Sequence, residues 1–360
     1  MSDLLVKVPI NGVSFGQVSY NLLKQMFENG LDIALFPIGD KADLSCYDKC
    51  DEKFQNWIRD SIQHRYNKLS PDTPSFSLWH IKGSESSLGE KSLLYTFHET
   101  SEAHENEKNV ISMYDKVLFS SSFSKSVFDG CPNVDFVPIG FDTDIKKTEK
   151  KYFRDDIIHF TLVGKFEKRK NTKKILELWS KKYGNNSNYS LSCLINNGFM
   201  DAKDLNKELN EALGNKRVFN INFLPYLKTN SEVNDLYNSC DIDLSGLSSG
   251  EGWNLPSFNT TALGKWSIVS NYSSHKDWAN NENCILVEPS GSRSVEDGVF
   301  FNNVDFNCGT FCELSDESIM EAFEKAEKLA KTPNPKGEEL TQKFTYKKMY
   351  DDIMSHIKSM

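Results

Sequence analysis

The sequence lacks several features that would place it in a class at once. No segment approaches the ~20 apolar residues that a membrane-spanning helix needs, and the N-terminal stretch MSDLLVKVPING has neither the apolar core nor the cleavage site of a signal peptide. Basic residues are in deficit, with 42 Lys and Arg against 51 Asp and Glu and a net charge of −9. An acidic chain has no general field that attracts nucleic acid or anionic lipid. We therefore expect a cytoplasmic protein without a transmembrane segment, for which nucleic acid is not the expected partner.

Metal-site spacing is also missing. Among the eight cysteines, the pairs Cys46/Cys50 and Cys308/Cys312 each have three residues between their members. Zinc sites commonly place two to four residues between ligands, but they also need a second pair or histidines at metal-site spacing, which neither pair has. We therefore predict reduced thiols, as is usual for a cytosolic protein, and no metal site.

The glycine fingerprint of nicotinamide-binding domains is absent as well. In the stretch NGVSFGQ, three residues separate Gly12 from Gly16, and no third glycine follows at the required offset. A nicotinamide site, and with it an oxidoreductase, is therefore poorly supported. Gly16 would still let the backbone approach a ligand closely, because glycine has no Cβ.

What the sequence does have is a repeated alternation of short β-rich runs and amphipathic helices. With 360 residues, the chain is long enough for two domains of roughly 100–200 residues each. The alternation predicts an α/β fold with two Rossmann-like domains, each a parallel sheet with helices on both faces. The expected strands are residues 4–10, 32–38, 76–81, 93–97, 116–120 and 134–138, and then 157–163, 189–196, 218–224, 241–245, 266–269 and 284–287.

The segment FDTDIKKTEKKYFRD is charged and poor in apolar residues, so it suits a linker. We predict an N-terminal domain over residues 1–145 and a C-terminal domain over 146–335. Residues 336–360 would return to the N-terminal domain, because the last helix has an apolar face that needs a surface to pack on. A cleft between the two domains is the default ligand site.

The stretch SGEGWNLP, residues 249–256, follows a short apolar run and precedes a helix-like run. Pro256 suits the first turn of a helix, and Gly264 suits the position just after its end. The turn over Gly252–Leu255 would then offer unpaired N–H groups and the positive end of a helix dipole to an anion. Glu251 beside this turn would accept hydrogen bonds from hydroxyl groups. Donors for phosphate next to an acceptor for hydroxyls suit a sugar phosphate. An ordinary strand-to-helix loop with a solvated glutamate is the competing interpretation.

The stretch VGKFEKRKN, residues 163–171, also lies between a strand and a helix. Gly164 begins the turn, and Asn171 or Thr172 could cap the helix. Lys165 and Lys170 would bring two ammonium groups to one helix N-terminus, which suits a diphosphate. The competing interpretation is a basic, solvated loop.

A histidine follows the apolar run LLYTF at His98, where ligands of open α/β sheets bind. A histidine at such a position can equally be a structural residue.

These features, in this order, resemble the retaining glycosyltransferases of family 4, which have the GT-B fold. The region 233–289 is similar to that family's helix, strand, glutamate loop, helix and closing segment, and VGKFEKRKN is similar to its phosphate loop. VDFVPIGFDTDI resembles its interdomain segment. SLWHI and LLYTFHE resemble its two histidine motifs.

The resemblance implies that residues 1–145 form the acceptor-side domain and residues 146–335 the nucleotide-sugar-binding domain. It also implies a role for each matched residue. Lys165, Lys170 and Gly164 would bind the donor diphosphate, which Gly16 would approach from the N-terminal domain. His98 would hydrogen-bond the transferred sugar. Glu251 would hold sugar hydroxyls, and the oxygens of the sugar or phosphate would meet the N–H groups of the turn: Gly252, Trp253, Asn254 and Leu255.

One departure concerns the ribose. The family has a second glutamate eight positions after the first, where this chain has Asn259. A hydrogen bond to a charged group contributes ~1.5–3 kcal/mol, against ~0.5–1.5 kcal/mol for a neutral one. The change therefore leaves the nucleotide preference, UDP or GDP, open. The base would lie near Pro225–Leu227, which makes Tyr226 a donor-binding candidate.

We hypothesise a retaining hexosyltransferase that moves a sugar from a nucleotide diphosphate sugar to an acceptor hydroxyl. No cofactor would be required besides this co-substrate, because the lysines supply the charge that Mg²⁺ otherwise would. The aspartate pairs Asp142/Asp144 and Asp241/Asp243 resemble metal-binding triplets but lie in a linker and a buried-looking strand.

Two alternatives remain open. The acceptor could be a nucleic-acid base, as in phage-type glucosylation, or the chain could bind nucleotide sugars without transferring them, as Asn259 suggests. A glycan, a lipid-linked or a small-molecule acceptor all fit the main hypothesis. The sequence does not identify the sugar, the acceptor or the oligomeric state.

Overall fold

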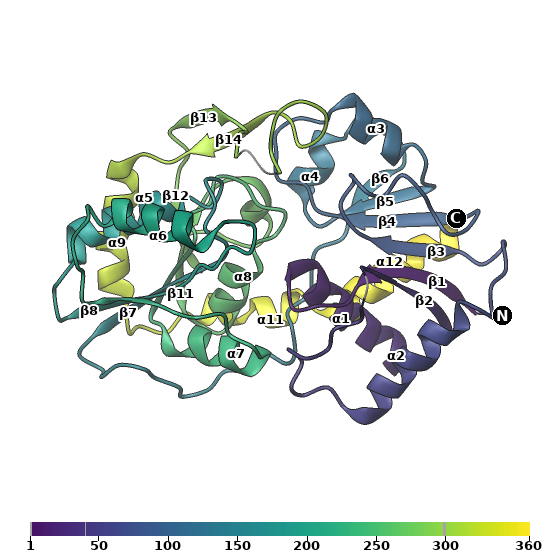
Figure 1. The fold of residues 1–360 in the computed structure, drawn as a ribbon, viewed down its shortest axis with the longest axis horizontal. Helices are drawn as coiled ribbons and strands as arrows, with labels where there is room; N and C mark the ends of the chain where they lie inside the picture. Colours follow the sequence, from purple (N-terminus) through teal and green to yellow (C-terminus); the bar gives the residue numbers. More distant parts are fainter. Residues whose placement is uncertain (1, 40, 298–299) are drawn as a thin grey trace. The chain divides into compact units, whose positions relative to one another are not determined.

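The computed structural model describes residues 2–39, 41–297 and 300–360. The chain divides into two compact units. Unit 1 comprises Met1–Asp144, Asn303–Cys308 and Lys343–Met360, and unit 2 comprises Ile145–Asn302 and Gly309–Gln342. Both units are α/β (Figure 1).

Unit 1 is built on a sheet that, within the described residues, has six parallel strands in the order β2-β1-β3-β4-β5-β6. This order changes direction between β1 and β3, where ligands of doubly wound sheets bind. The elements are β1 (Leu4–Pro9), α1 (Ser14–Glu28), β2 (Ile33–Ile38), α2 (Glu52–His64), β3 (Ser75–Leu78), β4 (Ser92–Thr96), α3 (Glu105–Ile111), β5 (Lys116–Phe119), α4 (Ser122–Val127), β6 (Val134–Phe136) and α12 (Tyr346–Ser359).

The C-terminal helix α12 packs on unit 1, as the sequence predicts. It lies against α1 in Figure 1, where the yellow helix crosses behind the purple strands. Its apolar face, spaced at helical intervals, is buried there: Tyr346, Tyr350, Ile353 and Ile357. Gly140 meets the start of this helix so closely that a Cβ on it would lie 2.2 Å from the Tyr346 backbone nitrogen.

Unit 2 has its own sheet, in which the described residues form six parallel strands in the order β12-β11-β10-β7-β8-β9. Its elements are β7 (Ile158–Val163), α5 (Thr172–Tyr183), β8 (Tyr189–Leu194), α6 (Ala202–Ala212), β9 (Ile221–Phe223), α7 (Asn230–Ser239), β10 (Ile242–Gly246), α8 (Leu255–Ala262), β11 (Trp266–Ser270), the 3-10 turn η1 (Ser273–Asp277), β12 (Cys284–Val287), β13 (Gly291–Ser294), β14 (Thr310–Glu313), α9 (Asp316–Leu329) and α10 (Pro335–Glu338), with α11 (Leu340–Lys343) at the unit boundary.

The sequence does not anticipate three of these elements: β13, β14 and η1. β13 and β14 form an antiparallel hairpin in a region rich in serine, glycine and asparagine, where no period-two apolar pattern stands out. The short turn η1 has no helical periodicity to detect. The hydrophobic core of unit 2 is the layer between the sheet and its helices, with the fully buried Phe160, Trp179 and Phe323 at its centre.

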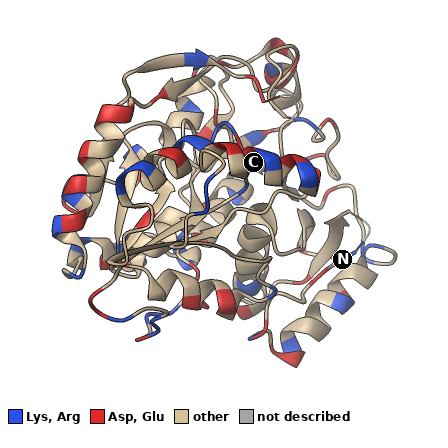
Figure 2. Ribbon diagram, turned by 60° about the vertical axis from the view of Figure 1, so that its left-hand side comes forward, with Lys and Arg blue, Asp and Glu red and all other residues tan. Residues whose placement is uncertain are grey.

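Charged side chains of both signs are interspersed along the helices (Figure 2). None of the helices in the described residues combines the length and the apolar character needed to cross a membrane. The eight cysteines, all of them within the described residues, are free thiols.

Replacing Gly140 with alanine should loosen the packing of α12. The new Cβ would overlap backbone atoms of Thr345 and Tyr346, which cannot move as a side chain can. We expect a loss of ~1–3 kcal/mol or more in the free energy of unfolding, measured by urea denaturation. Gly130→Ala is the matched control, since its Cβ would meet nothing within 4 Å. Equal midpoints for the two variants would show that this close approach is unimportant.

Candidate functional site

Two loops meet at the point where the strand order of unit 2 changes direction. β7 and β10 are neighbouring parallel strands, with Phe160 opposite Ile242, while the chain continues from β7 to β8 on the other side. In doubly wound sheets this switch point, beyond the carboxyl ends of the strands, is where ligands bind. The loop after β7 contains VGKFEKRKN, and the loop after β10 contains SGEGWNLP. The topology therefore brings the two motifs to one edge.

In the first loop, glycine and asparagine supply the unusual backbone. Gly164 has φ 150°, and a Cβ there would lie 3.0 Å from Lys170 Cδ, so the Lys170 side chain runs past it. Asn171 occupies the N-cap of α5 in a left-handed conformation (φ 53°), but its side chain does not cap the helix. Instead its Nδ2 donates to the Leu247 carbonyl (2.9 Å) and Ser249 Oγ (3.0 Å). Asn171 thus joins the two loops, and the expectation that its side chain caps α5 is wrong.

Glu251 is the centre of the arrangement. It is buried, and its two oxygens form ion pairs with Lys170 Nζ (2.8 Å) and Arg169 Nη1 (2.9 Å). The same Arg169 nitrogen donates to the Gly250 carbonyl at 2.5 Å. Burial alone would raise the pKa of Glu251, but the Arg169 and Lys170 charges outweigh it and lower that pKa to about 2. The solvated glutamate of the competing interpretation is therefore excluded.

The ion pairs extend outward from Glu251. Arg169 Nη2 lies 3.4 Å from Glu167, whose other oxygen lies 3.9 Å from Lys165 Nζ. The Lys165 ammonium also faces the rings of Phe199 and Phe300, at 5.0 and 5.4 Å from their centroids. Lys170 thus contacts Glu251 directly, whereas Lys165 is linked to it through Glu167 and Arg169.

The helix after Glu251 begins as the sequence predicts. Asn254 is the N-cap of α8, in a left-handed conformation (φ 68°), and its side chain accepts from the Ser257 N–H. Pro256 lies in the first turn, and Gly264, with φ 84°, follows the C-cap residue Leu263. Leu255 is the first helical residue, and Trp253 is almost fully buried.

A buried carboxyl group links the strands and the helix that flank the two loops. Asp243 in β10 accepts from Ser245 Oγ (2.6 Å) and from Ser257 Oγ of α8. Ser245 Oγ in turn accepts the Val163 N–H of β7 at 2.8 Å. Burial raises the pKa of Asp243. This network fixes β7, β10 and α8 relative to one another, so Asp243 has a structural role rather than that of a metal ligand.

Asn259 and Tyr226 differ in exposure. Asn259 lies in α8, and its Oδ1 is buried without a hydrogen-bond partner among the described residues. Tyr226 follows β9 and is 64% exposed. Gly252 lies within the turn next to Glu251 and is buried.

Gly16 and His98 belong to unit 1. Gly16 is near the start of α1, where a Cβ would lie 2.0 Å from the Asn11 carbonyl oxygen, so close packing of its own loop requires glycine there. His98 follows β4 and is buried, with Nε2 2.9 Å from Thr100 Oγ1 and Nδ1 3.8 Å from Glu107. The packing of unit 1 alone therefore accounts for a glycine at position 16 and for a buried histidine at position 98.

Sequence reasoning missed two residues of the site. Arg169 lies inside the basic stretch, but its neighbours Lys168 and Lys170 have the same charge, so nothing marks it as the partner of Glu251. His275 is fully buried and bonds to Asn254 (Nε2 to Nδ2, 3.0 Å). The run SSHKDW that contains it lies in the region similar to family 4, but nothing in that run marks the histidine, and only the fold places it beside the glutamate loop.

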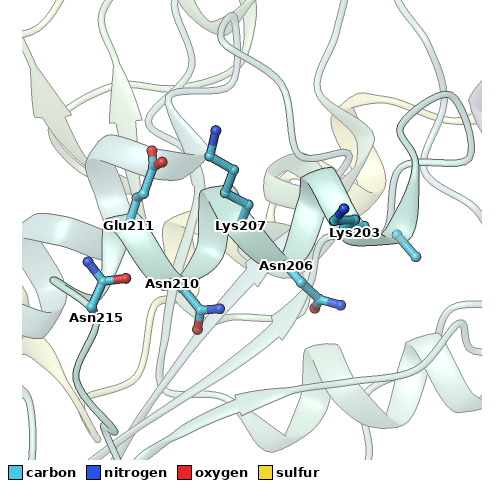
Figure 3. Close-up of a pocket in the computed structure, with 7 residues that line it drawn as sticks. Lys203, Asn206, Lys207, Asn210, Glu211 and Asn215 are labelled. Atoms are coloured by element: carbon cyan, nitrogen blue, oxygen red, sulfur yellow. The ribbon is translucent and has the colours of Figure 1, made fainter.

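A separate hollow of about 720 Å³ lies along α6, lined by the labelled side chains of Figure 3 and by Ala202. Its lining contains none of the predicted site residues. Within the described ranges, no group of three or more histidine, cysteine or acidic side chains is arranged to hold a metal ion.

Solved structures resemble the whole chain. Sucrose-phosphate synthase from Thermosynechococcus elongatus matches with a TM-score of 0.69 and 11% identity, over 100% of this chain and 99% of that one. The chain has the GT-B fold. The GT-B neighbours include a glycosyltransferase from Rickettsia africae (TM-score 0.65, 12% identity, 99% of this chain and 97% of that one). They also include Anabaena HepE in complex with UDP and glucose (TM-score 0.65, 9% identity, 100% of each chain).

No protein-family model matches the sequence, and no curated protein does. Likeness at this level of identity establishes the GT-B architecture, whereas activity has to be argued from the residues at the switch point.

Replacing Arg169 with methionine should destabilise unit 2 strongly. The change keeps most of the side-chain volume but leaves Glu251 with one cation in a buried setting, and removing one partner of a buried ion pair costs ~3–5 kcal/mol. Lys168→Met is the control in the same loop, because that side chain is exposed, and it should change the unfolding free energy by no more than ~0.5 kcal/mol. Urea denaturation measures both. Equal losses would show that the Arg169–Glu251 pair contributes little.

The stability of the protein should fall with acid because of two buried histidines. Burial lowers the pKa of His159 and of His275 from 6.5 to about 4. Between these values the unfolded chain binds protons that the folded chain does not, so stability is fully present above pH 6.5 and is lost toward pH 4. Replacing His159 with glutamine should shrink the difference in unfolding free energy between pH 7 and pH 5 by ~2 kcal/mol. Urea titrations at both pH values test this, and an unchanged difference would contradict it.

Proposed function

We propose that this protein transfers a sugar from a nucleotide diphosphate sugar to an acceptor hydroxyl, with retention of the anomeric configuration. The observation that supports this most directly is the contact of Lys170 and Arg169 with the buried Glu251 at the switch point of a GT-B unit. Cations, a carboxylate and two helix N-termini at one sheet edge suit a ligand that combines phosphates with sugar hydroxyls.

The diphosphate would bind at the loop over Gly164–Asn171. An ammonium group has three N–H donors, so Lys170 can keep its bond to Glu251 and still meet phosphate oxygens. The first turn of α5 adds backbone N–H groups, because the Asn171 side chain at its N-cap bonds elsewhere. Lys165, more exposed than Lys170, would meet the outer phosphate oxygens.

The transferred sugar would lie at Glu251. Its ionised oxygens each have a second acceptor site beyond the ion pairs, so sugar hydroxyls can donate to them. The turn over Gly252–Leu255 would supply N–H groups to the same sugar or to phosphate. Gly16 and His98 belong to unit 1, and only the resemblance to family 4 supports a role for them in donor binding.

The nucleoside would lie on the side of Asn259 and Tyr226. Asn259 Oδ1, buried and without a partner among the described residues, is the acceptor that we assign to the ribose. Tyr226 offers an exposed ring to the base.

In the reaction, the bond between the anomeric carbon and the diphosphate oxygen breaks, and negative charge develops on that oxygen. Lys170, Lys165 and the α5 N-terminus are placed to receive this charge. The acceptor hydroxyl would attack from the same face as the leaving group and lose its proton to the departing phosphate, which gives retention without a covalent enzyme intermediate.

The donor class can be tested by thermal shift. A ligand that binds the folded state at 100 times its Kd stabilises it by ~2.7 kcal/mol. We expect a UDP or GDP sugar to raise the melting temperature. If UDP, GDP and ADP sugars all leave it unchanged, the proposed function fails. Binding without transfer or hydrolysis on a panel of glycan and small-molecule acceptors would instead support the non-catalytic alternative.

Replacing Lys170 with methionine should lower the rate of transfer by about 10²–10³-fold, since a positioned contact to the leaving group is lost. Lys168→Met, two positions earlier and exposed, should transfer at nearly the rate of the unmodified protein. Initial rates with saturating donor measure the effect. Rates within twofold of each other for the two variants would remove Lys170 from the mechanism.

A further inference from the structure

A second segment of unit 2 holds the glutamate loop in place. The turn η1 and the residue after it form hydrogen bonds with the loop from Glu251 to Asn254. Ser273 Oγ accepts the Glu251 N–H (2.9 Å), and the Ser274 N–H donates to the Glu251 carbonyl (3.4 Å). Trp278 Nε1 donates to the Trp253 carbonyl at 3.2 Å. These bonds fix the backbone on both sides of Gly252.

His275 makes the contact to the last residue of the loop. Asn254 Nδ2 approaches His275 Nε2 at 3.0 Å, and His275 Nδ1 lies 3.0 Å from both the carbonyl and the hydroxyl oxygen of Ser270. The imidazole is fully buried and hydrogen-bonded through both nitrogens. It therefore connects the end of β11 to the N-cap of α8.

The partners of this imidazole determine where its proton lies. The Ser270 hydroxyl donates to the Ser248 carbonyl (2.6 Å), so both Ser270 oxygens act as acceptors toward Nδ1. The Asn254 amide is oriented by two backbone groups: its Nδ2 donates to the Ser245 carbonyl (2.9 Å), and its Oδ1 accepts the Ser257 N–H. An NH₂ group therefore faces Nε2. The ring is neutral, with hydrogen on Nδ1 and a lone pair on Nε2.

The charges around the ring are consistent with this state. Burial, the largest effect, lowers the pKa of His275 to about 4. The Glu251 carboxylate opposes the shift, and Lys170 and Arg169 add to it. Hydrogen on Nε2 would place two donors face to face, and protonation of both ring nitrogens would add a positive charge that Lys170 and Arg169 disfavour.

We propose that His275 is a positioning residue of the donor site: its Nε2 lone pair holds the left-handed Asn254, and through it the turn that presents Glu251 and its neighbouring N–H groups to the sugar diphosphate. The identity of the ligand in this inference rests on the proposed function, whereas the contacts of His275 do not depend on it. The acceptor at Nε2, rather than the bulk of the ring, is the feature that the site requires.

Three variants separate the effect of the Nε2 acceptor from the effect of the bulk of the ring. His275→Phe keeps the ring and removes the acceptor. His275→Gln returns a side-chain oxygen that can accept from Asn254. His159→Phe is the matched control, because His159 is also a buried imidazole in unit 2, bonded to Ser239 and Ser192, but near the start of β7 and so at the opposite end of the strand from the site.

Calorimetric titration with UDP, and with GDP and ADP in parallel, measures the binding affinity of each variant. We expect His275→Phe to bind about tenfold more weakly or worse, because a buried donor loses its acceptor and the turn shifts. His275→Gln should recover to within about threefold of the unmodified protein, and His159→Phe should bind normally despite a similar loss of stability. Equal weakening in the two phenylalanine variants, or no weakening in His275→Phe, would overturn the proposal.

Nitrogen NMR of the unmodified protein gives a second measurement that needs no variant. The imidazole of His275 should show the neutral form with hydrogen on Nδ1 at pH 7, and hydrogen on Nε2 would overturn the assignment. If the unmodified protein binds no nucleotide, the proposed function fails, and the amide signals of residues 251–254 decide the inference. A change of these signals in His275→Phe but not in His159→Phe supports it, and any other pattern overturns it.

Discussion

The site depends on one buried carboxylate held between two cations. Glu251 has lost most of its contact with water, and Arg169 and Lys170 compensate for that loss at 2.9 and 2.8 Å. Because a buried charge without a partner is strongly unfavourable, the loop after β7 and the loop after β10 have to meet. The ion pairs therefore fix the geometry at the switch point and keep Glu251 ionised across the physiological pH range.

Two hydrogen-bond networks, one around Asp243 and one around His275, support this ion-pair cluster. Asp243 joins β7, β10 and α8 through serine hydroxyls, and His275 joins β11 to the N-cap of α8. Each network bonds to a residue in or next to the two loops. A sugar diphosphate would thus meet side chains and N–H groups that are already oriented, which reduces the reorganisation needed as charge develops on the leaving oxygen.

The same arrangement explains why fold alone does not give the activity. The GT-B architecture supplies a switch point with two helix N-termini, and the neighbours share that architecture at 9–12% identity. The residues that this chain places there include Lys165 and Lys170, Asn259 in α8, and the segment η1 with His275. In the proposed function, donor preference and acceptor choice would depend on these residues and on loops that the architecture does not specify.

The sequence by itself determined the strands of the two parallel sheets, the two-sheet architecture and the presence of Glu251 and Lys170 at strand-to-helix turns, because apolar periodicity and turn residues act locally. It did not determine which cations meet Glu251. Lys165, Lys168, Arg169 and Lys170 have the same charge in a short stretch, and only the path of the loop past Gly164 turns Lys170 and Arg169 toward it. His275 and the hairpin of β13 and β14 were likewise invisible, since the contacts that define them join residues distant in sequence, and such contacts exist only once the sheet has assembled.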